Sequence, residues 1–171
     1  FTVVSLFFLL ALRAKSQVWQ FAAQQLQSIH KLRKLAAIAM LVLFVQIALG
    51  GWTTSNYAAV ACPDLPTCQG EMWPEANFAK GFNIIQEIGP NYLGGQMENS
   101  ARVAIHLSHR IGAIITTVVL LLLLAKLIAI GPQTTRLGFI GAGVLLLQVG
   151  LGLSNIIFHL GRMVFTAQKF Q

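Results

Sequence analysis

One long apolar stretch, residues 102–130, constrains the fold of this chain more than any other part of its sequence. From Ile111 to Leu124 it holds no charged residue and no proline, and its only polar side chains are Thr116 and Thr117. A run of this length and composition is typical of a helix that spans a membrane. We therefore predict a transmembrane helix here.

A histidine stands near the start of this predicted helix, at a depth where ionisable residues are rare. His109 lies 17 residues before Lys126, which corresponds to about 26 Å along a helix. If Lys126 marks one membrane interface, His109 lies just inside the opposite one. Ionisable residues in such a place usually face the interior of a bundle and carry function.

The face of the helix around His109 fits two interpretations. Positions three, four and seven residues apart share a face, and here they are Arg102, His106, Gly112, Ala113 and Thr116. Small residues beside an imidazole leave room for a flat group such as haem, with an arginine available for a propionate. A pair of histidines hydrogen-bonded to neighbouring helices fits the same residues equally well.

The whole chain has the composition of an integral membrane protein. It has 171 residues, of which 56% are hydrophobic and 10% charged, and its mean hydropathy is +0.69. We predict further spans at residues 35–53 and 136–159, and a tail at 160–171. Residues 1–13 are expected to be the end of a helix whose start is missing, which makes the chain a fragment. The predicted fold class is all-α, an antiparallel transmembrane helix bundle.

The charges are divided between two connecting segments. Residues 14–34 hold basic side chains and no acid, whereas residues 54–101 hold all five acids of the chain. By the positive-inside rule, the basic connection is expected in the cytoplasm and the acidic loop outside it. The net charge of +7 is therefore explained by topology, and we expect no nucleic-acid partner.

The loop at residues 54–101 also contains both cysteines of the chain. Cys62 and Cys68 are six residues apart, on the oxidising side, with two prolines between them. This pattern favours a structural disulfide over a redox-active pair, and zinc would need further ligands that the loop does not offer. The many aromatic residues nearby indicate that the loop folds over the membrane face as a cap.

Gln46 lies in the middle of the predicted span at residues 35–53. We expect it to form an inward hydrogen bond, as part of ordinary helix packing. The pattern Gln-x-x-Leu-Gly that begins at Gln46 recurs at Gln148 in the last span. Its recurrence is a hint of an internal repeat.

Four features together resemble the heme A synthase family over residues 1–158. They are residues 46–52, the Cys62–Cys68 loop, the pair His109-Arg110 and residues 148–155. Members of that family have eight membrane helices in two similar halves, each offering two axial histidines to a haem site. They oxidise a methyl group of heme O to the formyl group of heme A for cytochrome oxidase assembly. The resemblance implies that this chain is the carboxy-terminal half, half of an eight-helix, two-repeat architecture.

The resemblance also implies a set of site residues. His109 would be an axial ligand to the iron of a heme b cofactor, with Arg110 as its signature neighbour. His106 and Arg102 are the other cofactor-binding candidates, and Cys62 and Cys68 would be bonded. His106 stands where the other half of the family has a glutamate linked to catalysis, so this oxidoreductase fragment would lack the catalytic half. No catalytic residue is assigned.

The implied partners are heme O as substrate, the missing amino-terminal half, heme O synthase and membrane lipid. The implied location is the bacterial inner membrane, which the chain crosses several times, with residues 54–101 outside the cytoplasm. The second axial ligand is not assigned, and His159 is a candidate substitute. Two rival functions remain: a membrane b-type cytochrome that only transfers electrons, and a non-haem transport or assembly subunit.

Overall fold

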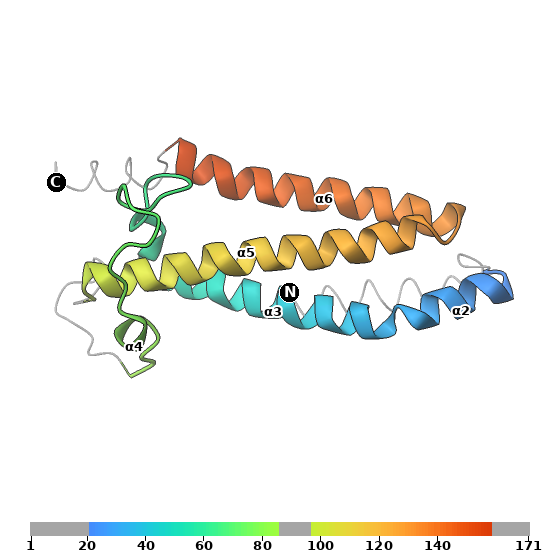
Figure 1. Ribbon diagram of the computed structural model, residues 1–171, viewed down its shortest axis with the longest axis horizontal. Helices are drawn as coiled ribbons and strands as arrows, with labels where there is room; N and C mark the ends of the chain where they lie inside the picture. Colours follow the sequence, from blue (N-terminus) through green and yellow to red (C-terminus); the bar gives the residue numbers. More distant parts are fainter. Residues whose placement is uncertain (1–20, 86–96, 159–171) are drawn as a thin grey trace.

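Long helices that run side by side make up most of the molecule in the computed structural model, which describes residues 21–85 and 97–158 (Figure 1). Predictions about the truncated first helix, His159 and the tail lie outside the described residues. The helices are α2 (Ala23–Lys31), α3 (Arg33–Ser55), the 3-10 helix η1 (Ala58–Val60), α4 (Phe78–Gly81), α5 (Asn99–Ile128) and α6 (Pro132–Ile157).

Three of these helices are long and apolar enough to cross a membrane. They are α3, α5 and α6, with 23, 30 and 26 residues. α5 lies between the other two and packs against both (Figure 1). The described part of the chain contains no β-strand. The predicted fold class, an all-α membrane helix bundle, is confirmed.

The turn between α5 and α6 brings these two helices together directly. Pro132 begins α6. Proline lacks a backbone N–H, and at the first position of a helix this group has no partner within the helix in any case. Further along α6, a Cβ atom on Gly141 would lie 2.6 Å from the Leu124 side chain of α5, and one on Gly138 would collide with Ile128. These glycines therefore permit the close approach of the two helices.

The loop that follows α3 folds over the first turns of α5, at one end of the bundle (Figure 1). A buried cluster joins it to the helix and consists of Ala61, Cys62, Cys68, Val103 and Leu107. The predicted cap is thus present, but its core is made of the two cysteines and small or aliphatic residues. The aromatic side chains remain largely outside it, because Trp73 is 67% exposed and Tyr57 44% exposed.

α4 holds the other side of this cap against α5. The indole of Trp52, near the end of α3, donates to the carbonyl of Gly81 over 2.9 Å. A Cβ atom on Gly81 would lie only 2.7 Å from the carbonyl oxygen of Ala101. A glycine at this position therefore lets the backbones of α4 and α5 meet. A surface ion pair between Lys80 and Glu98 joins the same two segments.

Candidate functional site

His109 of α5 faces the middle of α3, where Gln46 holds it by two contacts. The amide nitrogen Nε2 of Gln46 lies 3.0 Å from the ring nitrogen Nδ1 of His109. The same amide nitrogen donates to the backbone carbonyl of His109 over 3.1 Å. The structure gives the other ring nitrogen, Nε2 of His109, no hydrogen bond within the described residues. One edge of the imidazole is therefore held by Gln46, and the other makes no hydrogen bond within the described residues.

Two glycines give this pair the space it occupies. A Cβ atom on Gly50 of α3 would lie 3.2 Å from Cε1 of the His109 ring. A Cβ atom on Gly112 of α5 would collide with the amide oxygen of Gln46. Gly50 thus admits the ring and Gly112 admits the amide. The sequence predicted that small residues beside His109 leave room for a flat group, but at Gly112 that space is filled by the amide of Gln46.

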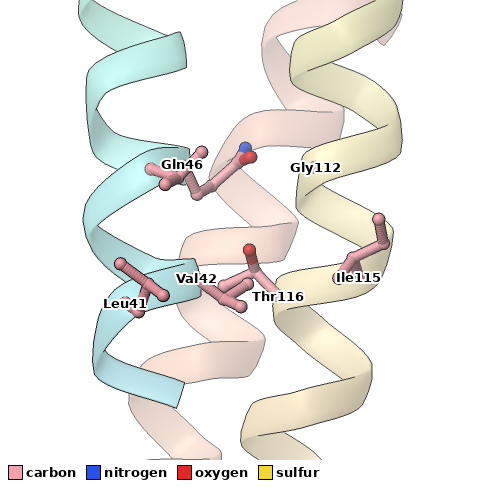
Figure 2. Close-up of a pocket in the computed structure, with 7 residues that line it drawn as sticks. Leu41, Val42, Gln46, Gly112, Ile115 and Thr116 are labelled. Atoms are coloured by element: carbon pink, nitrogen blue, oxygen red, sulfur yellow. The ribbon is translucent and has the colours of Figure 1, made fainter. Parts of the chain in front are cut away.

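Below this pair, α3 and α5 enclose an apolar groove of about 240 Å³ (Figure 2). Gln46 and Gly112 lie at one end of it, and Thr116 points between the helices one turn further along. Thr116 is only 5% exposed. Within the described residues, the hydroxyl of Thr116 and the amide oxygen of Gln46 are buried without a hydrogen-bond partner.

His106 has a different environment from His109, although the two share a helix face. It is 4% exposed, and its Nδ1 lies 2.9 Å from the carbonyl oxygen of Ala58 in η1. The imidazole is thus enclosed beneath the cap and bonded to its backbone. A ring in this position joins the cap to α5, and it has little surface to offer to a flat ligand.

Arg110 connects the same cap to α5 through three carbonyl groups. Its guanidinium donates to the carbonyl oxygens of Cys62, Asp64 and Thr67, each over 2.8 Å. All three carbonyls belong to the ring closed by the Cys62–Cys68 disulfide, which is present as predicted. A planar guanidinium carries several donors in a fixed arrangement, so it can satisfy converging acceptors. Arg110 therefore fixes the disulfide loop next to His109.

Asp64 organises the same loop from its outer side. Its carboxylate accepts hydrogen bonds from the hydroxyl of Thr67 and from the backbone N–H groups of Gly70 and Gln69. These donors, the Thr67 hydroxyl most of all, lower the pKa of Asp64 from 3.8 to about 2. Because hydrogen bonds to an ionised carboxylate favour its charged form, Asp64 is ionised throughout the neutral range.

The arrangement around His109 fits the histidine side of a haem site. One imidazole nitrogen is held by a neighbouring side chain and the other is unbonded. Binding of iron at Nε2 also requires Nδ1 to carry the ring proton and donate it to that neighbour. Arg102 lies two turns before His109 and is partly buried. Within the described residues there is no group of three or more metal-ligating side chains. A porphyrin supplies four ligands of its own, so a single axial histidine is the contribution that this half-site requires.

The sequence singled out His109 as a candidate ligand and predicted an inward hydrogen bond for Gln46 as part of helix packing. The structure confirms the inward hydrogen bond of Gln46 and shows that its partner is His109. A signal was present, since an amide at mid-membrane depth needs a partner. The partner of Gln46 could not be identified without the register between α3 and α5, which no sequence pattern specifies.

Comparison with known proteins relates the chain to one family. The model of the COX15-CtaA family, described as cytochrome oxidase assembly protein, matches residues 1–165. The chain belongs to this family. Among curated COX15-CtaA relatives, the heme A synthase of Shewanella oneidensis is 42% identical over 160 residues, which cover 94% of this chain. The matched part is 47% of that protein, so the chain spans about half the length of this relative. No solved structure matches the chain.

Proposed function

We propose that this chain is the haem-binding, carboxy-terminal half of a heme A synthase. The complete protein would oxidise the methyl group of heme O to the formyl group of heme A for cytochrome oxidase assembly. The 42% identity to a heme A synthase over nearly the whole chain supports this proposal. In this proposal the reacting half lies in the other part of the protein, and the chain acts as an oxidoreductase only together with it.

The observation that carries the proposal is the state of His109. Its Nδ1 is held by Gln46, while its Nε2 has no hydrogen-bond partner in the part of the chain that the structure describes. We assign this Nε2 as an axial ligand to the iron of a heme b, which would supply a one-electron centre when bound. The partner ligand would come from another part of the complete protein, with His159 as the candidate in this chain.

The neighbouring residues have separate roles in this proposal. Arg102 is assigned to a haem propionate, because it is the cation two turns outward from His109 on the same face. His106 and Arg110 hold the disulfide cap against α5, through Ala58 and through three loop carbonyls. They act on the cofactor through the position of α5 and the cap.

We propose a bacterial inner-membrane location, with the acidic loop and its disulfide outside the cytoplasm. The charge division between residues 14–34 and 54–101 supports this orientation. Reporter fusions at Lys80 and at Gln24 test it. The expected result is activity of a periplasmic reporter at Lys80 and of a cytoplasmic reporter at Gln24. The reverse pattern would contradict the proposed topology.

The experiment that tests the haem assignment compares His109→Ala with His106→Ala in the full-length protein. Iron held by two imidazoles is low-spin, and loss of one imidazole opens a coordination position. We expect His109→Ala to lose the low-spin spectrum of the carboxy-terminal haem, and His106→Ala to retain it. The opposite result would move the ligand to His106, and a normal spectrum in both variants would reject a haem on this helix.

The same preparation separates a synthase from an electron-transfer cytochrome. Incubation with heme O and reductant in air, followed by extraction and mass measurement of the haem, detects the formyl product. Heme A is the expected product. A reducible low-spin haem without conversion of heme O would instead identify a b-type cytochrome, and absence of haem would favour a transport or assembly subunit.

A further inference from the structure

The amide of Gln46 contacts His109 in an arrangement that leaves one amide atom unsatisfied. Its nitrogen faces both Nδ1 and the backbone carbonyl of His109. Its oxygen Oε1 is buried without a hydrogen-bond partner among the described residues. An amide NH2 only donates, so Nδ1 accepts here and the ring proton is on Nε2 of His109. This is the tautomer that cannot bind iron through Nε2.

The opposite tautomer becomes available through a change within one side chain. Rotation of the terminal amide of Gln46 by 180° exchanges its oxygen and nitrogen, and this torsion is broad and roughly two-fold in glutamine. Oε1 then faces Nδ1 and accepts a hydrogen bond from it, while the hydrogen bond from the amide nitrogen to the backbone carbonyl of His109 is lost. The ring proton moves from Nε2 to Nδ1, so no proton is gained or lost, and the Nε2 lone pair is free for iron.

Two glycines border the pair closely. Gly50 borders the His109 ring, and Gly112 borders the Gln46 amide so closely that an added Cβ atom would collide with it. Both neighbours are part of membrane-spanning helices, which hold the amide and the ring in register. The amide therefore stays next to the ring, and its orientation decides which of its atoms faces Nδ1.

We propose that Gln46 is a positioning residue that sets the tautomer and ring orientation of His109, with its amide oxygen accepting from Nδ1 when Nε2 binds iron. The inference rests on the proposed role of His109 as an axial ligand. Residues bonded to the second nitrogen of a metal-bound histidine orient the ring and raise its basicity. A more basic ligand stabilises ferric iron and lowers the reduction potential, so Gln46 acts on affinity and potential together.

The test uses the full-length protein with Gln46→Leu and Gln46→Glu, and Gln148→Leu as the matched control. Gln148 begins the same sequence pattern in α6 and is exposed, with no hydrogen bond to the described residues. Haem titration and redox titration are the readouts. Loss of an outer partner of this kind typically weakens binding by about 10- to 100-fold. We expect Gln46→Leu to bind haem more weakly by this factor and to have a higher haem reduction potential. Gln148→Leu should keep the wild-type affinity and reduction potential.

Gln46→Glu decides the question if Gln46→Leu does not accumulate in the membrane. Glutamate has nearly the same shape and presents only acceptors to Nδ1, so we expect retained haem and a lower potential than in the wild type. The inference is supported if the haem reduction potential rises in Gln46→Leu and falls in Gln46→Glu, or if Gln46→Glu alone can be measured and its potential is lower. An unchanged or higher potential in Gln46→Glu overturns it.

His109→Ala in the same preparation separates this inference from the proposed function. If His109→Ala loses the low-spin haem while both Gln46 variants match the wild type in affinity and potential, only the role of Gln46 is wrong. If His109→Ala keeps the low-spin haem, the ligand assignment itself is wrong, and the role of Gln46 fails with it.

Discussion

Arg110→Ala should release the disulfide loop from α5. The variant removes three hydrogen bonds from one charged group to the carbonyls of Cys62, Asp64 and Thr67. A hydrogen bond from a charged donor contributes about 1.5–3 kcal/mol. Because these three share one half-buried guanidinium and are not additive, we expect the free energy of local opening to fall by about 3 kcal/mol. That change corresponds to about a 100-fold rise in the open population.

Amide hydrogen exchange measures this opening directly. The N–H groups of Cys68 and Glu71 bond to each other's carbonyl oxygens across the loop, and their exchange should accelerate by about 100-fold in Arg110→Ala. Arg136→Ala is the matched control, since Arg136 is exposed on α6. Arg110→Lys should fall between them, because a single ammonium cannot reproduce the geometry of a guanidinium. Wild-type exchange in Arg110→Ala would refute the role given to this residue.

Three further predictions concern the cap. The pKa of Asp64 is lowered from 3.8 to about 2, so its stabilisation of the loop should be present above about pH 4 and be lost as the pH falls towards 2. Amide hydrogen exchange in the loop should show this pH dependence in the wild type and lack it in Asp64→Asn. An equal pH response in both proteins would contradict the prediction. Gly81→Ala should displace α4, because its Cβ would lie 2.7 Å from the Ala101 carbonyl oxygen. We expect the free energy of unfolding to fall by about 1–3 kcal/mol, measured by thermal unfolding. An unchanged unfolding midpoint would count against this contact. Reduction of the Cys62–Cys68 bond should lower the free energy of unfolding by about 2–3 kcal/mol, the value for closing so short a loop. Denaturation with and without reductant measures this difference. Two free thiols in unreduced protein would exclude the bond.

The cap and the bundle differ in what holds them together. In the bundle, α3, α5 and α6 keep most of their side chains at the surface, where a membrane would contact them, and glycines set their spacing. In the cap, buried aliphatic residues, a disulfide and hydrogen bonds to backbone carbonyls order the loop. Because His106 and Arg110 belong to α5 and bond to the cap, the cap fixes the end of the helix that carries His109.

The membrane-spanning helices, the fold class and the disulfide could all be predicted from the sequence. Hydropathy identifies a span because every backbone polar group in lipid must be satisfied within the segment, so a long apolar run has few alternatives to a helix. The cysteines could be paired because they are close in sequence and separated by turn-forming prolines. The family resemblance also followed from local motifs, since each of them is a short run of residues.

The contacts of the candidate site residues became known only from the packing of the helices and the loop. The sequence placed His106, His109 and Arg110 about one turn apart on the same helix and made all three candidates for a cofactor, without showing what each side chain contacts. Their contacts lie 43 to 63 positions away in the chain, at Thr67, Ala58 and Gln46. Such contacts depend on the register between helices and on the path of a loop, which are set by packing and by the satisfaction of buried polar groups. No periodicity in the sequence encodes that register.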